Sequence, residues 1–229
     1  MSNYSSSIAK LTNKAIYKSY GWMCIGLTFT AIISYMISMI PAVQNIIFGS
    51  FLLPLLIIFS QIGIIAAMGS MIKRISYFSM VSLFMLYSFL NGLTLSILFK
   101  IFELDSIIGI FFVTAGISGV MSLYGLFTKS NLNSFGIFGI ATLSGVLVFS
   151  ILNIFIKSIK LDFYMSFFAV VAIAALIAYD SQRTKEILME FAYDNQQQKK
   201  MSIFAALNMY INFISLFLRL LHMFGKRKD

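Results

Sequence analysis

A few polar side chains interrupt a chain that is otherwise almost continuously apolar, and these are the groups that could do chemistry. Asp180 stands at the end of a long apolar run, in Ala178-Tyr179-Asp180-Ser181-Gln182. Four polar residues of the next apolar run are spaced by four, three and four positions, which puts them on one face of a helix: Asn208, Asn212, Ser215 and Arg219. A carboxylate beside hydrocarbon is costly, so this pattern indicates a functional site that attracts cations.

Three further polar residues accompany earlier apolar runs. Asn91 and Gln61 lie inside such runs, and Arg74 follows the second run. Amide side chains inside membranes commonly join helices by hydrogen bonds, and a basic side chain at a helix end commonly reaches toward the headgroups. We therefore expect Asn91, Gln61, Asn208 and Ser215 either to line a polar pathway or to hold helices together.

The composition identifies lipid as the main solvent of this protein. Of the 229 residues, 59% are hydrophobic and only 11% are charged, with a mean hydropathy of +0.90. A soluble domain carries about 25% charged residues. The formal net charge of +9 comes from basic residues between apolar runs, where they orient helices rather than bind nucleic acid. We expect one integral membrane domain over residues 1–229.

Seven apolar runs predict an all-α, seven-helix transmembrane bundle. Each is long enough for a helix that crosses about 30 Å of hydrocarbon, and none alternates as the strands of a barrel would. The runs are Trp22–Ile40, Phe48–Met71, Tyr77–Phe99, Ile107–Phe127, Phe135–Ile156, Phe163–Tyr179 and Ile203–Phe224. The polar stripe on the last run predicts that this helix lies inside the bundle.

The basic residues between the runs predict the orientation. More of them fall on the side of the N-terminus, which is therefore expected in the cytoplasm with the polar segment 1–21 and a loop over 181–202. That side holds Lys10, Lys14, Lys18, Lys73, Arg74, Lys129, Arg183, Lys185, Lys199 and Lys200; the other holds Lys100, Lys157, Lys160, Lys226, Arg227 and Lys228. Seven crossings put the C-terminus outside, but a last run that turned back would improve the charge balance. Charge alone leaves the final crossing open.

Small residues four positions apart predict close packing in the middle helices. Ala115 and Gly119, Ser118 and Ser122, and Ala141 and Gly145 form such pairs. Pairs of this kind let helix backbones approach one another in membranes.

Metal-dependent and nucleophilic catalysis find no support. Cys24 and His222 are the single cysteine and the single histidine, so neither has a second ligand of its type. No nucleophile–base pair and no phosphate-binding loop is visible. We expect no enzyme, no catalytic metal and no cofactor.

Three segments resemble the Bax inhibitor-1 (transmembrane Bax inhibitor motif) family. They are Asn91-Gly92-Leu93-Thr94-Leu95, the segment around Asp180 quoted above, and Ala206-Leu207-Asn208-Met209-Tyr210-Ile211-Asn212-Phe213-Ile214-Ser215-Leu216-Phe217. The resemblance implies seven helices with the seventh surrounded by the others, and a pH-sensitive calcium leak across the membrane. In eukaryotes the family is linked to suppression of cell death. The short loops favour a prokaryotic member in the inner membrane.

The resemblance assigns roles to three residues. Asp180 matches the first of the family's paired aspartates, and Arg74 matches an arginine that partners the pair in bacterial relatives. Asn212 stands where the second aspartate is expected. Two carboxylates that share a site repel and act as a proton switch, and an Asp–Asn pair lacks this repulsion. One carboxylate and one amide imply only weak binding of a calcium ion in transit.

Depth is an obstacle to contact between Asp180 and Asn212. Asp180 ends its apolar run, whereas Asn212 lies nine residues inside the next, about 13 Å at the helical rise. Either the sixth helix continues past its apolar run or the two side chains do not meet.

Two functions follow for an integral membrane protein of this kind. The first is a passive calcium leak with Asp180, Arg74 and Asn212 at its ion pathway or gate. The alternative is a non-conducting interaction protein that acts on a membrane protease or another membrane protein. The alternative places function in the N-terminal segment 1–21 and the loop 181–202.

Overall fold

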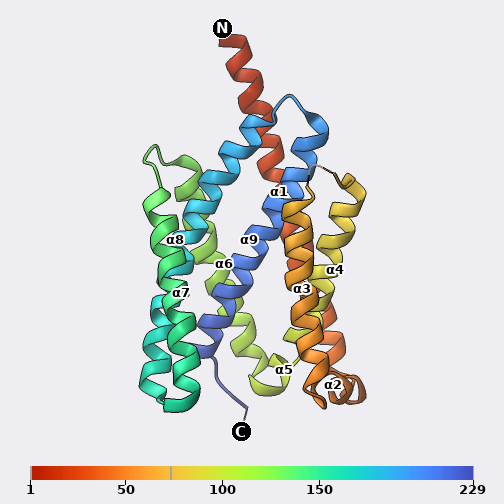
Figure 1. The fold of residues 1–229 in the computed structure, drawn as a ribbon, viewed down its shortest axis with the longest axis vertical. Helices are drawn as coiled ribbons and strands as arrows, with labels where there is room; N and C mark the ends of the chain where they lie inside the picture. The colour runs from red at the N-terminus through yellow and green to blue at the C-terminus, as the bar shows by residue number, and fades with distance from the viewer. Residues whose placement is uncertain (1, 73, 229) are drawn as a thin grey trace. The chain divides into compact units, whose positions relative to one another are not determined.

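The computed structural model describes residues 2–72 and 74–228, with side chains from residue 7 onward except that of Ile159 (Figure 1). Lys73, counted above among the basic residues, lies outside the described residues. The helices of the described chain are α1 (Ser2–Ser38), α2 (Pro41–Phe48), α3 (Leu52–Ser70), α4 (Tyr77–Leu95), α5 (Leu98–Ile101), α6 (Leu104–Phe127), α7 (Asn133–Ile156), α8 (Ile159–Glu190) and α9 (Asn195–Phe224).

In the described part of the chain, seven helical stretches are long and apolar enough to cross a membrane, which confirms the all-α class and the seven expected spans. The spans of α1, α8 and α9 are longer than their apolar runs because each continues into polar sequence. Two short helices were not expected. α2 begins with Pro41, whose missing N–H suits a first helical turn, and α5 follows a break after α4, inside the third span.

The segment expected as a loop over 181–202 is mostly helical. α8 continues to Glu190 and α9 begins at Asn195, so only 191–194 lies outside the helices. Asp194 explains the new start, because its Oδ1 accepts hydrogen bonds from the backbone N–H groups of Gln196 (3.1 Å) and Gln197 (3.0 Å). A carboxylate in this position satisfies amides that have no partner inside the helix.

The described chain forms two compact units, and the first contains Met1–Ile101, Glu186–Tyr210 and Lys228. Its centre is Tyr210, which is fully buried. The Tyr210 hydroxyl lies 2.7 Å from the Oγ1 of Thr30, and that Oγ1 donates to the carbonyl of Ser88 at 2.9 Å. The ring of Phe84 meets Tyr210 edge to face at 6.0 Å. These contacts join α1, α4 and the first half of α9.

The second unit contains Phe102–Lys185 and Ile211–Arg227. Its core joins Ile173 and Ile177 of α8 to Leu216 and Leu220 of α9. All four side chains are almost fully buried, so dispersion contacts rather than polar groups hold most of this interface. Phe111 adds α6 to this core, since the centroids of the Phe111 and Phe213 rings lie 5.2 Å apart in an edge-to-face contact.

The glycines that allow close packing in this unit are not the expected ones. A Cβ on Gly125 would lie 2.1 Å from the carbonyl oxygen of Ala178, and one on Gly139 would lie 2.5 Å from Leu176. At Gly119 and Gly145 an added Cβ would meet nothing within 4 Å. The expected role of Gly119 and Gly145 is therefore wrong, because those positions face open space in the described structure.

The C-terminal tail pairs with the connection that follows the third span. Phe102 and Arg227 form an antiparallel bridge, and the Glu103 amide donates to the carbonyl of Lys226 at 2.9 Å. The Lys228 amide donates to the carbonyl of Ile101 at 2.9 Å. The Glu103 carboxylate lies 2.8 Å from the Lys226 ammonium and, by this hydrogen bond and by its charge, raises the pKa of Lys226.

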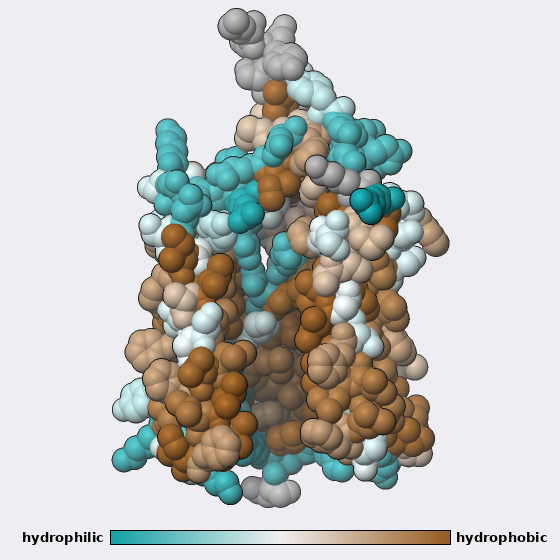
Figure 2. Space-filling model, viewed as in Figure 1, coloured by the Kyte–Doolittle hydropathy of each residue, from teal (hydrophilic) through white to brown (hydrophobic). Residues whose placement is uncertain are grey.

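Large apolar side chains cover much of the outer surface, as a lipid environment requires. Figure 2 shows them over the visible faces of α3 and α7. The aromatic rings of Phe51 and Phe155 are 84% and 81% exposed. The seventh span, formed by α9, is more buried than the others. In its most apolar part 61% of the residues are buried inside the protein, compared with 11% in the span of α3.

Candidate functional site

The two site residues on α8 and α9 meet in the second unit. The Asn212 amide donates from Nδ2 to the Oδ2 of Asp180 at 2.6 Å. Both side chains are half-buried. A short bond from an amide N–H to a carboxylate oxygen is the geometry of a charge-assisted hydrogen bond.

The length of α8 resolves the question of depth. The helix continues ten residues beyond Asp180, to Glu190, and Asn212 lies 17 residues into α9. Ten residues at the helical rise are about 15 Å, so Asp180 is well inside its helix rather than at the end. The sixth helix continues past its apolar run, and this continuation brings the carboxylate alongside Asn212.

Close packing fixes the turn of α8 that carries Asp180. The Ala178 carbonyl and the Cβ of Ser181 lie against Gly125 of α6, where a Cβ would collide with both. The ring of Tyr179 lies against Gly136 of α7, where an added Cβ would be 2.9 Å from it. Because α6 and α7 approach α8 this closely on either side of Asp180, the carboxylate has little freedom to move with its helix.

Gln182 and Lys185 fasten the same part of α8 to the α6–α7 connection. Gln182 accepts from the Leu132 amide at 2.9 Å through Oε1 and donates from Nε2 to the Ser130 carbonyl at 2.8 Å. Lys185 donates from Nζ to the Leu126 carbonyl at 2.8 Å, which satisfies a carbonyl of the last turn of α6. The glutamine of the Tyr-Asp-x-Gln segment is therefore a structural anchor beside Asp180.

Arg74 lies in the first unit, in the turn between α3 and α4. Its side chain is exposed, and its backbone amide donates to the Met71 carbonyl at 2.8 Å. Asp180 and Asn212 belong to the second unit. The partnership of Arg74 with Asp180 therefore stays a prediction.

The other polar residues predicted from the sequence are divided between the two units. Asn91 is buried and donates to the Tyr87 carbonyl at 3.2 Å, and Gln61 reaches Thr94 of α4 at 3.4 Å. The Gln61 contact joins α3 to α4, which favours the packing interpretation for Gln61, whereas the Asn91 bond lies within α4. Asn208 and Ser215 are half-buried on α9, in the first and second unit respectively.

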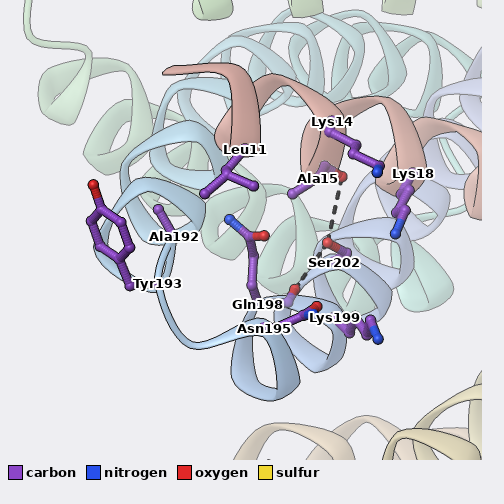
Figure 3. Close-up of a pocket in the computed structure, with 10 residues that line it drawn as sticks. All are labelled: Leu11, Lys14, Ala15, Lys18, Ala192, Tyr193, Asn195, Gln198, Lys199 and Ser202. Atoms are coloured by element: carbon purple, nitrogen blue, oxygen red, sulfur yellow. Dashed lines mark hydrogen bonds between the residues drawn. The ribbon is translucent and has the colours of Figure 1, made fainter. Parts of the chain in front are cut away.

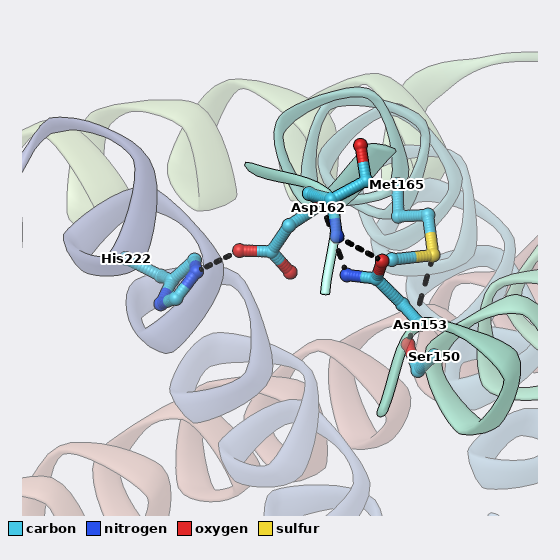
Figure 4. Close-up of polar contacts among 6 residues, drawn as sticks. Ser150, Asn153, Asp162, Met165 and His222 are labelled. Carbon is cyan, nitrogen blue, oxygen red and sulfur yellow. Dashed lines mark hydrogen bonds and ion pairs between the residues drawn. The ribbon is translucent and has the colours of Figure 1, made fainter. Parts of the chain in front are cut away.

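Sequence reasoning missed a polar cluster at the other end of the α8–α9 pair (Figure 4). The Nε2 of His222 and the Oδ2 of Asp162 are 2.5 Å apart. Beside them, Asn153 spans the α7–α8 turn by accepting from the Ser158 amide at 2.9 Å and donating to the Ser158 carbonyl at 3.3 Å. The sequence does contain a signal for this contact. Asp162 lies in the first turn of α8 and His222 in the last turn of α9, the next helix.

The arrangement at Asp180 can attract a cation but does not form a closed metal site. Among residues 2–72 and 74–228, no three His, Cys, Asp or Glu side chains lie close enough together to hold a metal ion. One carboxylate supplies two oxygens, and a calcium site normally uses six to eight oxygen ligands. The group therefore suits transient contact with a hydrated cation better than retention.

Fold and site together define a multi-pass helical membrane protein with a carboxylate–amide pair between its last two spans. Comparison with known proteins identifies the group: residues 12–229 match the family described as "Inhibitor of apoptosis-promoting Bax1". The chain belongs to this Bax inhibitor-1 family, as its sequence motifs predict.

Bacterial relatives cover nearly the whole chain. The inner membrane protein YbhL of Escherichia coli K12 is 37% identical over 210 residues, which are 91% of this chain and 90% of YbhL. An uncharacterised protein of Borreliella burgdorferi is 35% identical over 219 residues, 96% of this chain and 94% of the relative. A Rickettsia prowazekii protein, RP147, is 32% identical over 212 residues, 93% and 89% of the two chains.

Proposed function

We propose that this protein is a passive cation leak that passes calcium across the inner membrane. The observation that carries the proposal is the 2.6 Å bond between Asp180 and Asn212, a charged and an amide side chain between two spans. Carboxylates inside membrane bundles commonly mark ion pathways, because their cost in lipid is otherwise uncompensated. Membership of the family supports the choice of calcium, a hard cation that prefers oxygen ligands.

Each polar residue has a role in the proposed pathway. Asp180 attracts the cation, Asn212 holds the carboxylate and lines the path, and Arg74 neutralises Asp180 in a closed gate. Asn208 and Ser215 line the path on α9. Gln61 and Asn91 have packing roles, which the contact of Gln61 with Thr94 and the burial of Asn91 support. Because Asn212 adds no second carboxylate, we propose that the leak responds only weakly to pH. The protein needs no cofactor, catalyses no reaction, and holds calcium only in transit.

The proposed setting is the inner membrane, with the N-terminus and the α8–α9 connection in the cytoplasm. The relative YbhL is an inner membrane protein, which supports the compartment, and the basic residues beside the N-terminal spans support the orientation. The seventh helix lies at the centre of the single membrane domain, which fits the high buried fraction of its span. A surrounded helix can carry a polar stripe without exposing it to lipid.

Calcium flux into proteoliposomes tests the proposal directly. Purified protein should admit calcium faster than empty vesicles do. Asp180→Asn should lower the rate about tenfold or more, as expected for loss of the one charge in the path. Asp105→Asn is the matched control, because Asp105 is an exposed acid in the first turn of α6. Flux no greater than that of empty vesicles would end the leak proposal.

The rival function is that of a non-conducting protein that binds another membrane protein. The exposed polar face of α1 favours it, since Lys10 and Tyr17 are open to solvent and Tyr17 is 76% exposed. Deletion of Ser2–Lys10 should then abolish activity in cells while Asp180→Asn is tolerated. A leak predicts the opposite pair of results.

A further inference from the structure

A cavity of about 260 Å³ opens in the first unit, between the polar end of α1 and the start of α9 (Figure 3). It takes no part in the proposed ion pathway. Figure 3 shows Leu11 and Ala15 of α1 on one side, and Gln198 and Ser202 of α9 on the other. The full lining is Leu11, Lys14, Ala15, Lys18, Ala192, Tyr193, Asn195, Gln198, Lys199 and Ser202.

The lining is strongly positive. Lys14 and Lys18 come from consecutive turns of α1, and Lys199 comes from α9, so three ammonium groups border one cavity. None of the ten lining residues is an acid. Lysines held together without an acidic partner favour an anion between them, because an anion offsets their mutual repulsion.

Hydrogen bonds fix the wall between the two helices. Ser202 donates from Oγ to the Ala15 carbonyl at 3.4 Å and to the Gln198 carbonyl at 2.9 Å. Gln198 donates from Nε2 to the Leu188 carbonyl at 3.0 Å, which ties the start of α9 back to α8. Gln198 and Ser202 are buried, so burial and hydrogen bonds hold this part of the lining in place.

The helix lengths put the lysines at the depth of the lipid headgroups. From Lys18 to Ser38, the end of α1, are 20 residues, and from Lys199 to Phe224, the end of α9, are 25. At the helical rise these are about 30 and 37 Å. The hydrocarbon is about 30 Å thick, and about 40–45 Å with both headgroup layers. The cavity therefore lies where the phosphates of one leaflet are found.

We propose that this cavity binds a phosphate-bearing anion, and that its occupant is the headgroup of an anionic phospholipid. The three lysines contact the phosphate, and Asn195 offers an amide to the glycerol or phosphate oxygens. Leu11 and Tyr193, which are 39% and 57% exposed, border the cavity on the side of the polar segment, away from the hydrocarbon. Basic pockets between helices at the membrane boundary bind such headgroups.

Lipid titrations of the full-length protein, followed by native mass spectrometry, test this site. Wild type should retain phosphatidylglycerol much more tightly than phosphatidylcholine. The triple variant Lys14→Gln, Lys18→Gln, Lys199→Gln should bind phosphatidylglycerol about tenfold more weakly. The matched control is Lys10→Gln, Lys129→Gln, Lys160→Gln, which removes the same charge from exposed lysines outside the cavity and should bind as wild type does.

Two further arms keep the test decisive. The variant Lys14→Arg, Lys18→Arg, Lys199→Arg keeps the three positive charges and should retain phosphatidylglycerol. This variant distinguishes an effect of the charges from a failure to fold. Inorganic phosphate in excess should displace the lipid only weakly. Phosphate that binds as tightly as phosphatidylglycerol would overturn the assignment to a lipid. Equal weakening in the cavity and control variants, or equal retention of the two lipids, would overturn the site.

Discussion

Asp162 and His222 form a hydrogen bond of 2.5 Å that joins the first turn of α8 to the last turn of α9. An acid at a helix start and a base at a helix end each suit the charge of that helix terminus. Their side chains are 40% and 43% exposed, so water screens the attraction between them. The pair therefore specifies how the two helix ends meet more than it stabilises the fold.

Removal of this pair should have a small effect on stability. We expect Asp162→Asn, His222→Asn and the double variant to show a coupling free energy of about 0–1 kcal/mol, as measured for exposed pairs. Thermal unfolding in detergent completes the double-mutant cycle. A coupling well above that range would mean that solvent reaches the pair less than its exposure indicates.

Asn212→Asp should give the leak a pH response that wild type lacks. Two carboxylates at the 2.6 Å contact of Asp180 and Asn212 cannot both ionise without strong repulsion. Proton binding then becomes coupled to the α8–α9 contact, and the pair titrates as a unit. Calcium flux measured from about pH 5 to pH 8 should vary in the variant and stay nearly constant in wild type. Parallel profiles for the two proteins would count against a gate at this contact.

Two glycine substitutions should have opposite effects on stability. Gly125→Ala forces a Cβ to within 2.1 Å of the Ala178 carbonyl oxygen, and backbone cannot move aside cheaply. Overpacking of this kind costs about 1–3 kcal/mol. Gly145→Ala meets nothing within 4 Å and should be neutral or stabilise α7 by up to about 1 kcal/mol. Unfolding temperatures of the two variants provide the comparison, and a Gly125→Ala protein as stable as wild type would contradict the close approach.

Gln182→Ala should loosen the α6–α7 connection. The side chain makes bonds of 2.9 and 2.8 Å to the Leu132 amide and the Ser130 carbonyl. Loss of both hydrogen bonds leaves two backbone groups without these partners. We expect the free energy of unfolding to fall by about 1–3 kcal/mol. Hydrogen exchange at residues 128–134 should rise. Gln196→Ala, at an exposed position, is the control and should leave this segment unchanged.

Reporter fusions should place the C-terminal end and the α8–α9 connection on opposite sides of the membrane. Lys228 bonds to Ile101, so the C-terminus lies beside the connection that follows the third span. After three crossings from the N-terminus, that connection is on the far side. A fusion after residue 228 should be active outside the cytoplasm, and one inserted within 191–194 should be active inside. The same side for both would require a final helix that turns back.

The number and order of the spanning helices were predictable from sequence because the chemistry behind them is local. Hydrocarbon thickness sets the length of each apolar run, and an amide stripe on the last run signals a helix that protein must cover. The continuation of α8 to Glu190 was one of two open outcomes. It could not be chosen from hydropathy, since charged residues such as Arg183 and Glu186 are equally compatible with helix and loop.

The contacts between helices were less accessible. Small-residue spacing pointed to Gly119 and Gly145, whereas the close approaches occur at Gly125 and Gly139. Spacing identifies a face of a helix but not which neighbour meets it, and that depends on the packing of all the helices at once. For the same reason the sequence singled out Asp180 and Asn212, which the structure brings into contact, but not the anchoring role of Gln182.

The pairing of residues 226–228 with residues 101–106 has a consequence for the order in which the protein assembles. The Lys226 amide bonds to the Oγ of Ser106, a residue that the ribosome adds 120 positions earlier. The Ile101 carbonyl and the Glu103 amide, which pair with Lys228 and Lys226, therefore stay without these partners until residues 226–228 have been made. A chain that stops before Lys226 would keep its seven spanning helices yet lose these bonds to residues 101, 103 and 106.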